Sequence, residues 1–204
     1  MGLAQPKQSY TPQEYLRLER GATEKHAYFR GEIFAMAGGS VRHSLITARA
    51  IRHLGNRLAG RGCEVFESNL RVRIPRTTLY TYPDLSVVCG PVAFDPLDQD
   101  QETILNPTLI VEVLSPSTEA YDRGAKFENY QTIESLRGYL LLSQNAPRAE
   151  LFTRQPDDTW LYAASAGLDD GRVRLDFLNA ELPLSEVYDG VSFAAPAVDA
   201  PGAE

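Results

Sequence analysis

The feature that most constrains the fold of this chain is a glutamate in the middle of an apolar segment. Glu112 interrupts the run LIVEVL at residues 109–114, which has the length and the branched side chains of a buried β-strand. Because side chains alternate between the two faces of a strand, Glu112 shares its face with Ile110 and Leu114, and this face is expected to be interior. A buried carboxylate costs on the order of several kcal/mol unless it is paired, hydrogen-bonded or bound to a metal. The fold must therefore bring a partner to Glu112.

Two further charged groups are candidates for that partner. Asp84 directly precedes the apolar segment LSVV at residues 85–88, and Lys126 lies four residues after Asp122 on a predicted helix. Two acids on neighbouring strands with a lysine nearby suit a divalent metal ion with a charge-stabilising cation beside it. Structural explanations compete with this one: a turn for Asp84, a buried arginine as the partner of Glu112, and a surface helix pair for Lys126.

Periodicity and turn residues along the chain predict a mixed α/β domain. Thr11, Pro12 and Glu14 have the arrangement of a capping box at the start of a helix, and the segment GGS at 38–40 separates a hairpin from the longest helix. The strands at 83–89 and 108–114 are the most apolar and are expected to be central in the sheet. The other expected elements are a hairpin at 26–37, helices at 41–59 and 121–133, and strands at 63–74, 138–142, 148–154, 160–164 and 173–177.

The length of 204 residues fits one domain, predicted to span 1–193, followed by an Ala- and Pro-rich disordered tail at 194–204. No apolar run is long enough to cross a bilayer, and the N-terminus lacks the apolar stretch of a signal peptide, so a soluble cytoplasmic protein is expected. Cys63 and Cys89 lie in apolar segments without the spacing of metal ligands, and both are expected to be reduced core residues.

Charge is distributed unevenly along the chain, although the net charge of −7 by itself argues against a polyanionic partner. Residues 33–82 contain eight arginines and two glutamates, whereas residues 83–204 contain seven basic and twenty-one acidic residues. The basic face of the predicted helix at 41–59 is a candidate for contacts with DNA phosphates, and its members are Arg42, Arg49, His53 and Arg57. The alternative is that this face is the solvated outer side of a surface helix.

A set of short motifs is spread along most of the chain. They are EKH at 24–26, GEIFAMAG at 31–38, His43, Pro83-Asp84, EVLSPST at 112–118, and the trio Asp122, Lys126 and Tyr130. With this set the chain, from about Tyr10 to Val191, resembles the PD-(D/E)xK nuclease superfamily and more closely its Uma-type branch, a large bacterial group of restriction-endonuclease-like proteins. The superfamily usually has its lysine two residues after the acid, where this chain has Leu114. In the branch that the chain resembles, the lysine is displaced onto the following helix, which matches Lys126.

The resemblance implies a restriction-endonuclease-like core, in which a mixed central sheet is flanked by helices, with extra strands at the C-terminus. It also implies a DNA endonuclease that hydrolyses phosphodiester bonds with Mg²⁺ or Mn²⁺. Asp84, Glu112 and the backbone carbonyl of Val113 would hold the metal ion. Lys126 would orient the attacking water or help to deprotonate it. A homodimer would suit cleavage of both strands of a duplex.

One position departs from the family pattern. The family places a glutamate four residues before the hairpin glycine, and this chain has Ala27 there. Glu24 could substitute only if the backbone shifts, while His43, Asp122 and Tyr130 are further candidates for auxiliary roles. The alternative function is therefore a catalytically inactive nuclease-fold protein that binds DNA or a protein partner. A two-carboxylate glycosidase is a third hypothesis, which the lack of an aromatic cluster beside the buried acid disfavours.

Overall fold

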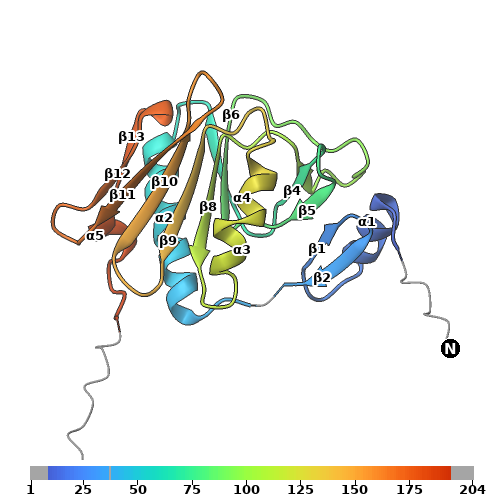
Figure 1. Ribbon diagram of the computed structural model, residues 1–204, viewed down its shortest axis with the longest axis horizontal. Helices are drawn as coiled ribbons and strands as arrows, with labels where there is room; N and C mark the ends of the chain where they lie inside the picture. Colours follow the sequence, from blue (N-terminus) through green and yellow to red (C-terminus); the bar gives the residue numbers. More distant parts are fainter. Residues whose placement is uncertain (1–8, 37, 194–204) are drawn as a thin grey trace, which may run out of the picture.

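The computed structural model describes residues 9–36 and 38–193, and the predicted disordered tail at 194–204 lies outside them. Within the described residues the chain forms a six-stranded sheet, a five-stranded sheet and a two-stranded ribbon (Figure 1). The six-stranded sheet has the order β11-β10-β9-β8-β6-β3 and comprises β3 (Cys63–Glu67), β6 (Leu85–Cys89), β8 (Leu109–Leu114), β9 (Gly138–Ser143), β10 (Arg148–Arg154) and β11 (Trp160–Ala166). The five-stranded sheet has the order β2-β1-β5-β4-β7 and comprises β1 (His26–Phe29), β2 (Glu32–Ala35), β4 (Arg71–Ile74), β5 (Leu79–Thr81) and β7 (Thr103–Ile104). The ribbon pairs β12 (Arg172–Leu175) with β13 (Ala180–Pro183).

Helices cover both faces of the six-stranded sheet (Figure 1). Helix α2 packs on one face together with the ribbon and α5, helices α3 and α4 lie on the other face, and α1 packs against the five-stranded sheet. The helices are α1 (Pro12–Arg20), α2 (Val41–Leu58), α3 (Glu119–Arg123), α4 (Ala125–Tyr130), α5 (Leu184–Val187) and the 3₁₀ helix η1 (Asp176–Leu178). The expected architecture, a mixed central sheet flanked by helices with further strands toward the C-terminus, is confirmed.

Strand β8, which contains the buried glutamate, is central in the six-stranded sheet. It pairs antiparallel with β6 and parallel with β9, and all of its residues are buried. Leu109 and Val111 belong to the core under α2, whereas Ile110 and Leu114 belong to the core under α4. Glu112 therefore lies on the α4 side of the sheet, as the alternation of side chains along the strand predicts.

The local signals that begin and end the early elements are confirmed. The hydroxyl of Thr11 accepts a hydrogen bond from the backbone N–H of Glu14, whose carboxylate in turn accepts from the backbone N–H of Thr11 (2.7 Å), so the capping box is complete. Ser40 caps α2 by accepting a backbone hydrogen bond in its first turn. The hairpin of β1 and β2 turns through Arg30 and Gly31, which both have positive φ (49° and 91°), as a two-residue hairpin turn requires.

The single strand predicted at 63–74 is wrong, because the chain turns at residues 68–70 and continues in the other sheet. The backbone N–H of Leu70 donates to the carbonyl of Glu67 (3.3 Å) and closes this turn. Strand β3, before the turn, belongs to the six-stranded sheet, and β4, after it, belongs to the five-stranded sheet. The alternation of apolar residues continues across this turn, so periodicity alone could not reveal it.

The single helix predicted at 121–133 is two short helices, α3 and α4, and the second ends at Tyr130. Gly124 separates them with φ −111° and ψ −107°, a backbone conformation outside the helical region. A Cβ atom at this position would lie 3.2 Å from the carbonyl oxygen of Ala120, a tight contact that the glycine avoids.

The prediction of two reduced cysteines is also wrong, because Cys63 and Cys89 form a disulfide bond. Strands β3 and β6 are antiparallel neighbours, and their register places the two cysteines directly opposite each other, with a Cα–Cα distance of 4.0 Å. Sequence spacing does not reveal which strands pair, so the sequence could not predict this bond. Disulfide bonds persist mainly in oxidising compartments, so the expected cytoplasmic location gains no support from this bond and stays a prediction.

No helix in the described part of the chain combines the length and the apolar character that crossing a bilayer requires. The boundaries of the single domain at 1–193 likewise stay a prediction.

Candidate active site

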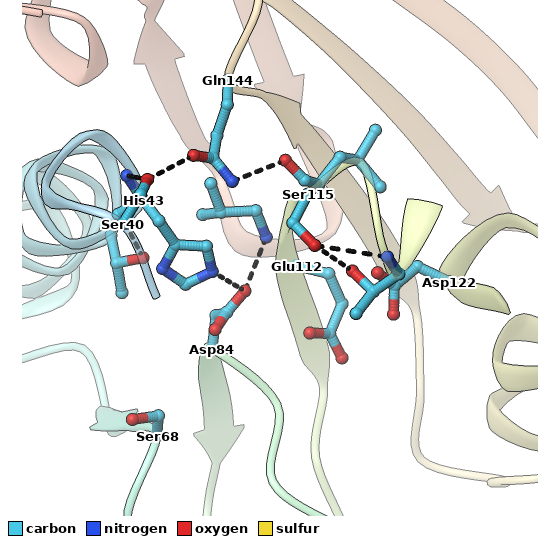
Figure 2. A network of polar contacts seen from close by, with 12 residues as sticks. Ser40, His43, Ser68, Asp84, Glu112, Ser115, Asp122 and Gln144 are labelled. Carbon is cyan, nitrogen blue, oxygen red and sulfur yellow. Dashed lines mark hydrogen bonds and ion pairs between the residues drawn. The ribbon is translucent and has the colours of Figure 1, made fainter. Parts of the chain in front are cut away.

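Asp84 lies directly before β6, at the point where the neighbouring strand β8 presents its middle residues. The backbone N–H of Val113 donates a hydrogen bond to Oδ2 of Asp84 (2.7 Å), and Nε2 of His43 lies 3.1 Å from the same oxygen (Figure 2). The side chain of Asp84 is 19% exposed. Two neighbours therefore fix this carboxylate, while part of it stays accessible to solvent.

Glu112 is far more deeply buried than Asp84, with 3% of its surface exposed. Nζ of Lys126 lies 2.7 Å from Oε1 of Glu112, and the hydroxyl of Tyr130 donates to the same oxygen (2.9 Å). Burial raises the pKa of Glu112 to about 8, against the opposing effect of the Lys126 charge. The competing sequence explanation, a buried arginine as its partner, is wrong, because its cationic partner is Lys126.

Lys126 bridges two acids from within the α3–α4 segment. Its Nζ also lies 3.1 Å from Oδ1 of Asp122, one helical turn earlier, and both side chains are buried. Burial alone would lower the pKa of Lys126, but the carboxylates of Glu112 and Asp122 raise it above its usual value. The surface helix pair considered for Lys126 and Asp122 is thus a buried pair that faces β8. Figure 2 shows Glu112 between Asp84 and Asp122.

His43 enters the site from the first turn of α2. The hydrogen bond with Asp84 raises the pKa of His43, and the nearby charges of Asp84 and Glu112 act in the same direction. A Cβ atom at Gly39 would lie 2.7 Å from Nδ1 of His43, so a glycine at that position leaves room for the imidazole ring. Among the auxiliary candidates, the structure brings His43, Asp122 and Tyr130 to the two acids.

Gln144 and Ser40 belong to the same network but carry no sequence signal. The hydroxyl of Ser40 donates to Oε1 of Gln144 (2.7 Å), and Nε2 of Gln144 donates to the carbonyl of Leu114 (2.8 Å; Figure 2). These bonds tie the start of α2 to the end of β8. The sole hint in the sequence was a polar side chain directly after the apolar strand β9.

Glu24 and Ala27 stay outside this network. Glu24 is exposed, and none of the contacts of Asp84 and Glu112 described above involves it. Ala27 pairs with Phe34 in the hairpin. The neighbouring Lys25 donates to the carbonyl of Ser68 (2.8 Å), which anchors the hairpin to the turn between the two sheets.

The basic face predicted on α2 is partly occupied by the C-terminal part of the chain. Arg42 donates to the carbonyl of Gln144 (3.0 Å), Arg49 forms an ion pair with Asp189 (3.2 Å), and Nε2 of His53 lies 3.0 Å from the carbonyl oxygen of Glu181. Arg57 is exposed. Contact of this face with DNA stays a prediction.

The donor set suits a hard divalent cation with an incomplete protein shell. Asp84 and Glu112 offer carboxylate oxygens, and Mg²⁺ is commonly held by one or two carboxylates with water or phosphate completing the shell. In the part of the chain that the structure describes, no group of three or more His, Cys, Asp and Glu side chains is placed to hold a metal ion. Two carboxylates are too few to enclose a structural metal, which takes four protein ligands.

Comparison with known proteins gives consistent matches along most of the chain. A family model described as "Uma2: Putative restriction endonuclease" matches residues 12–185. Two proteins of Synechocystis sp., both named "Uncharacterized protein", are similar: slr1290 is 40% identical over 189 residues (92% of this chain, 96% of the relative), and sll1609 is 36% identical over 168 residues (82% and 93%). A crystal structure from Anabaena variabilis, described as "a putative nuclease belonging to DUF820", superposes with a TM-score of 0.70 at 15% identity, over 88% of this chain and 97% of that chain.

Proposed function

Because the chain belongs to the Uma2 family of restriction-endonuclease-like proteins, we propose that it is a metal-dependent DNA endonuclease that hydrolyses phosphodiester bonds. The observation that carries the proposal is the arrangement of Asp84, Glu112 and Lys126: one accessible and one buried carboxylate on adjacent strands, with an ammonium group 2.7 Å from the buried one. Burying these charges together is unfavourable for the fold alone, and it becomes understandable if the site binds a cation and a phosphate.

Asp84, Glu112 and the backbone carbonyl of Val113 would hold Mg²⁺ or Mn²⁺ in this proposal. Such an ion supplies Lewis-acid polarisation of the scissile phosphate and activation of a water. His43 would keep Asp84 in its orientation, and the backbone N–H of Val113 holds the same oxygen from the other side. Tyr130 would keep Glu112 in its orientation, because the tyrosine hydroxyl donates to Oε1. Preorganised groups of this kind need no reorganisation when the substrate reacts.

Lys126 would act as a charge stabiliser and orient the attacking water. Its raised pKa keeps the ammonium group charged at neutral pH, which suits a donor that faces the negative charge developing on the phosphate. A general base would instead need a pKa near the working pH, so direct deprotonation of water by Lys126 is the less suitable role. Asp122 positions the ammonium group from one helical turn away.

The experiment that tests the proposal is cleavage of a supercoiled plasmid in the presence of Mg²⁺ or Mn²⁺. Glu112→Ala is expected to lower the rate by roughly 100-fold or more, because it removes a ligand and the partner of Lys126. The matched control is Glu134→Ala, an exposed glutamate after α4 that should leave the rate unchanged. Equal cleavage by wild type and Glu112→Ala would contradict the proposal, and so would the absence of Mn²⁺ density between Asp84 and Glu112 in soaked crystals.

The departure at Ala27 provides a second test. If the family glutamate at this position completes the site, Ala27→Glu should raise the cleavage rate of this chain. No gain would count against that role of the position, while leaving the test of Glu112 untouched.

The second candidate function is a nuclease-fold protein that binds DNA or a protein partner without cleaving it. Two observations favour it: the family glutamate is replaced by Ala27, and Lys126 neutralises Glu112 where a metal ion would bind. Calorimetric titration separates the two functions, because a catalytically inactive binding module should take up no Mg²⁺ or Mn²⁺. A homodimer that cuts both strands of a duplex belongs to the first proposal, and analytical ultracentrifugation of the full chain tests it.

A further inference from the structure

A cavity of about 340 Å³ lies between the α3–α4 segment and the edge of the five-stranded sheet. This volume is at the lower end of the range for small-molecule sites. Phe29 and Arg30 contribute from the hairpin, Thr77 from the turn between β4 and β5, and Tyr121 and Glu128 from the helices. None of these side chains takes part in the contacts of Asp84 and Glu112 described above.

The cavity and the candidate active site lie on different faces of the same short helical segment. Tyr121 and Ala125, four residues apart, line the cavity, whereas Asp122 and Lys126, the next residue in each case, reach toward Glu112. Because each of these pairs is adjacent in the sequence, the cavity and the site residues lie on the same short stretch of backbone.

The walls of the cavity suit a flat aromatic ligand. The guanidinium of Arg30 lies over the ring of Phe29, 4.9 Å from its centroid, and Tyr121 is 46% exposed on the opposite wall. Aromatic rings and arginine planes are the surfaces on which unpaired nucleobases stack. Phe29 is half-buried against the core under α4 and supports the guanidinium of Arg30, whereas the ring of Tyr121 is largely exposed.

The polar groups that line the cavity point to a ligand that donates hydrogen bonds and carries no negative charge. Oγ1 of Thr77 is buried away from solvent and is not among these groups. The amide nitrogen of Asn129 donates to the carbonyl of Ala125 (2.6 Å), which leaves its amide oxygen to accept from a ligand. Glu128 disfavours a phosphate at this position and can accept from an amino group. These features suit the edge of a nucleobase better than an anion.

The hairpin turn requires a positive φ at residue 30, and arginine is an unusual residue for it. Arg30 has φ 49°, a left-handed conformation in which Gly, Asn or Asp is usual at this turn position. An arginine there costs on the order of 1 kcal/mol relative to a residue that adopts the conformation freely. The residue that bears this strain is the one that covers the aromatic wall of the cavity.

We propose that this cavity receives a nucleobase of the nucleic-acid substrate, from a nucleotide next to the phosphodiester bound at Asp84, Glu112 and Lys126. The proposal rests on the function proposed above, because a polynucleotide is what connects the two sites. The base stacks on Tyr121 and on the guanidinium of Arg30, which lies on the ring of Phe29, and the amide oxygen of Asn129 accepts from its edge. The base must be unpaired to enter, so the site prefers single-stranded or locally opened DNA.

The test measures binding of a fluorescein-labelled single-stranded oligodeoxynucleotide to the full chain by fluorescence anisotropy, with EDTA present so that no cleavage occurs. Tyr121→Leu and Phe29→Leu should each raise the Kd about tenfold, the effect of losing one stacking surface. The matched control is Phe34→Leu, which changes an exposed aromatic residue of the same hairpin that does not line the cavity. Its Kd should equal that of the wild type.

Arg30→Gly separates the proposal from a loss of folding. Glycine fits the left-handed backbone, so this variant should melt at a higher temperature than the wild type and yet bind the oligonucleotide several-fold more weakly. Arg174→Ala removes an equally exposed positive charge far from the cavity and measures the contribution of charge alone. Equal weakening by Arg30→Gly and Arg174→Ala would overturn the proposal, and so would wild-type binding by Tyr121→Leu.

Parallel cleavage assays with Mg²⁺ distinguish failure of this proposal from failure of the proposed function. Plasmid cleavage by the wild type together with unchanged binding and cleavage by Tyr121→Leu would refute the base site and keep the nuclease. Oligonucleotide binding that depends on Tyr121, without cleavage by the wild type, would support the base site and refute the nuclease.

Discussion

The molecule buries charge in both of its sheets, and the two networks are built differently. In the five-stranded sheet, Arg71 is the centre of what we call the Arg71 network: its guanidinium donates to Thr103 (2.9 Å), to the hydroxyl of Tyr82 (3.0 Å) and to Asp98 (3.0 Å). The hydroxyl of Tyr82 donates onward to Glu19 (2.9 Å). Each of the three guanidinium nitrogens has a partner, so the network is satisfied from within the fold.

The Glu112 network, made of Asp84, Glu112, Asp122, Lys126 and His43, brings three carboxylates together with one lysine and one histidine. The Arg71 network has a similar set of charges, because Glu102 and Glu19 accompany Asp98. The two networks differ in the pKa of their buried acids. The pKa of Glu112 is raised by its burial, whereas Thr103 and Arg71 hold the pKa of Asp98 below its usual value although burial opposes this. The fold therefore stabilises the charged form of Asp98, whereas it disfavours the charged form of Glu112.

Among the variants considered, Arg71→Ala should lose the most stability. Arg71→Ala leaves the buried carboxylate of Asp98 without its cation and should lower the free energy of unfolding by about 3–5 kcal/mol. Urea denaturation followed by circular dichroism measures this change. Arg174→Ala breaks an exposed ion pair and should cost no more than about 0.5 kcal/mol. Similar losses in the two variants would contradict a stabilising role for the Arg71 network.

The same chemical change in both networks should have unequal results. Asp98→Asn replaces a carboxylate that accepts from Arg71 and Thr103, and should cost about 2–3 kcal/mol of unfolding free energy. Glu112→Gln removes one of three crowded carboxylates and should leave stability within about 1 kcal/mol of the wild type, while abolishing cleavage. If Glu112→Gln destabilised the protein as much as Asp98→Asn, the site would be a structural network like the other.

The pH dependence of stability should also differ in sign between the networks. Burial raises the pKa of Glu112 to about 8 in the folded protein, whereas its ordinary pKa is 4.5. The stabilisation from Glu112 is therefore complete below that ordinary value and is lost as the pH rises toward 8, at no more than ~1.4 kcal/mol per pH unit. For Asp98, whose pKa is lowered, stabilisation is present above its ordinary pKa and is lost as the pH falls through the folded value.

Unfolding curves in metal-free buffer between pH 5 and pH 8 check this prediction, with Glu112→Gln as the reference. Wild type and variant should be within about 1 kcal/mol of each other at pH 5, and the wild type should become progressively less stable than the variant as the pH rises. A difference that stays constant over this range would mean that Glu112 does not bind a proton in the folded protein.

The smallest expected effects come from removing one hydroxyl in each network. Tyr82→Phe removes a group that both accepts from Arg71 and donates to Glu19, so it should cost about 1–2 kcal/mol. Tyr130→Phe removes a single bond to Glu112 and should cost no more than about 1 kcal/mol. Thermal unfolding of both variants ranks the two losses of stability. A larger loss in Tyr130→Phe than in Tyr82→Phe would contradict this prediction.

The site residues that the sequence predicted are those whose signal is local. Glu112 stood out because one charge in an apolar strand violates the pattern of its own segment, and Asp122 and Lys126 stood out by helical spacing. Their positions are as expected, although the segment that carries them is two helices broken at Gly124.

The parts that could not be predicted depend on contacts between distant segments. Ser40 and Gln144 are 104 residues apart, and each is an ordinary polar residue in its own surroundings. The segment at 90–107 contributes Asp98 to Arg71, which lies 27 residues earlier in the chain. The change of sheet at residues 68–70 was hidden for the same reason, since sheet membership is decided by strand pairing and not by the strand itself.

The disulfide bond between Cys63 and Cys89 has a consequence for the covalent connectivity of the chain. It closes a ring that contains β4 and β5, two strands of the five-stranded sheet, together with Asp84. A protease that cuts once between residues 64 and 88 would leave the molecule in one covalent piece. Such a nick would become visible as two fragments only on a gel run with reductant.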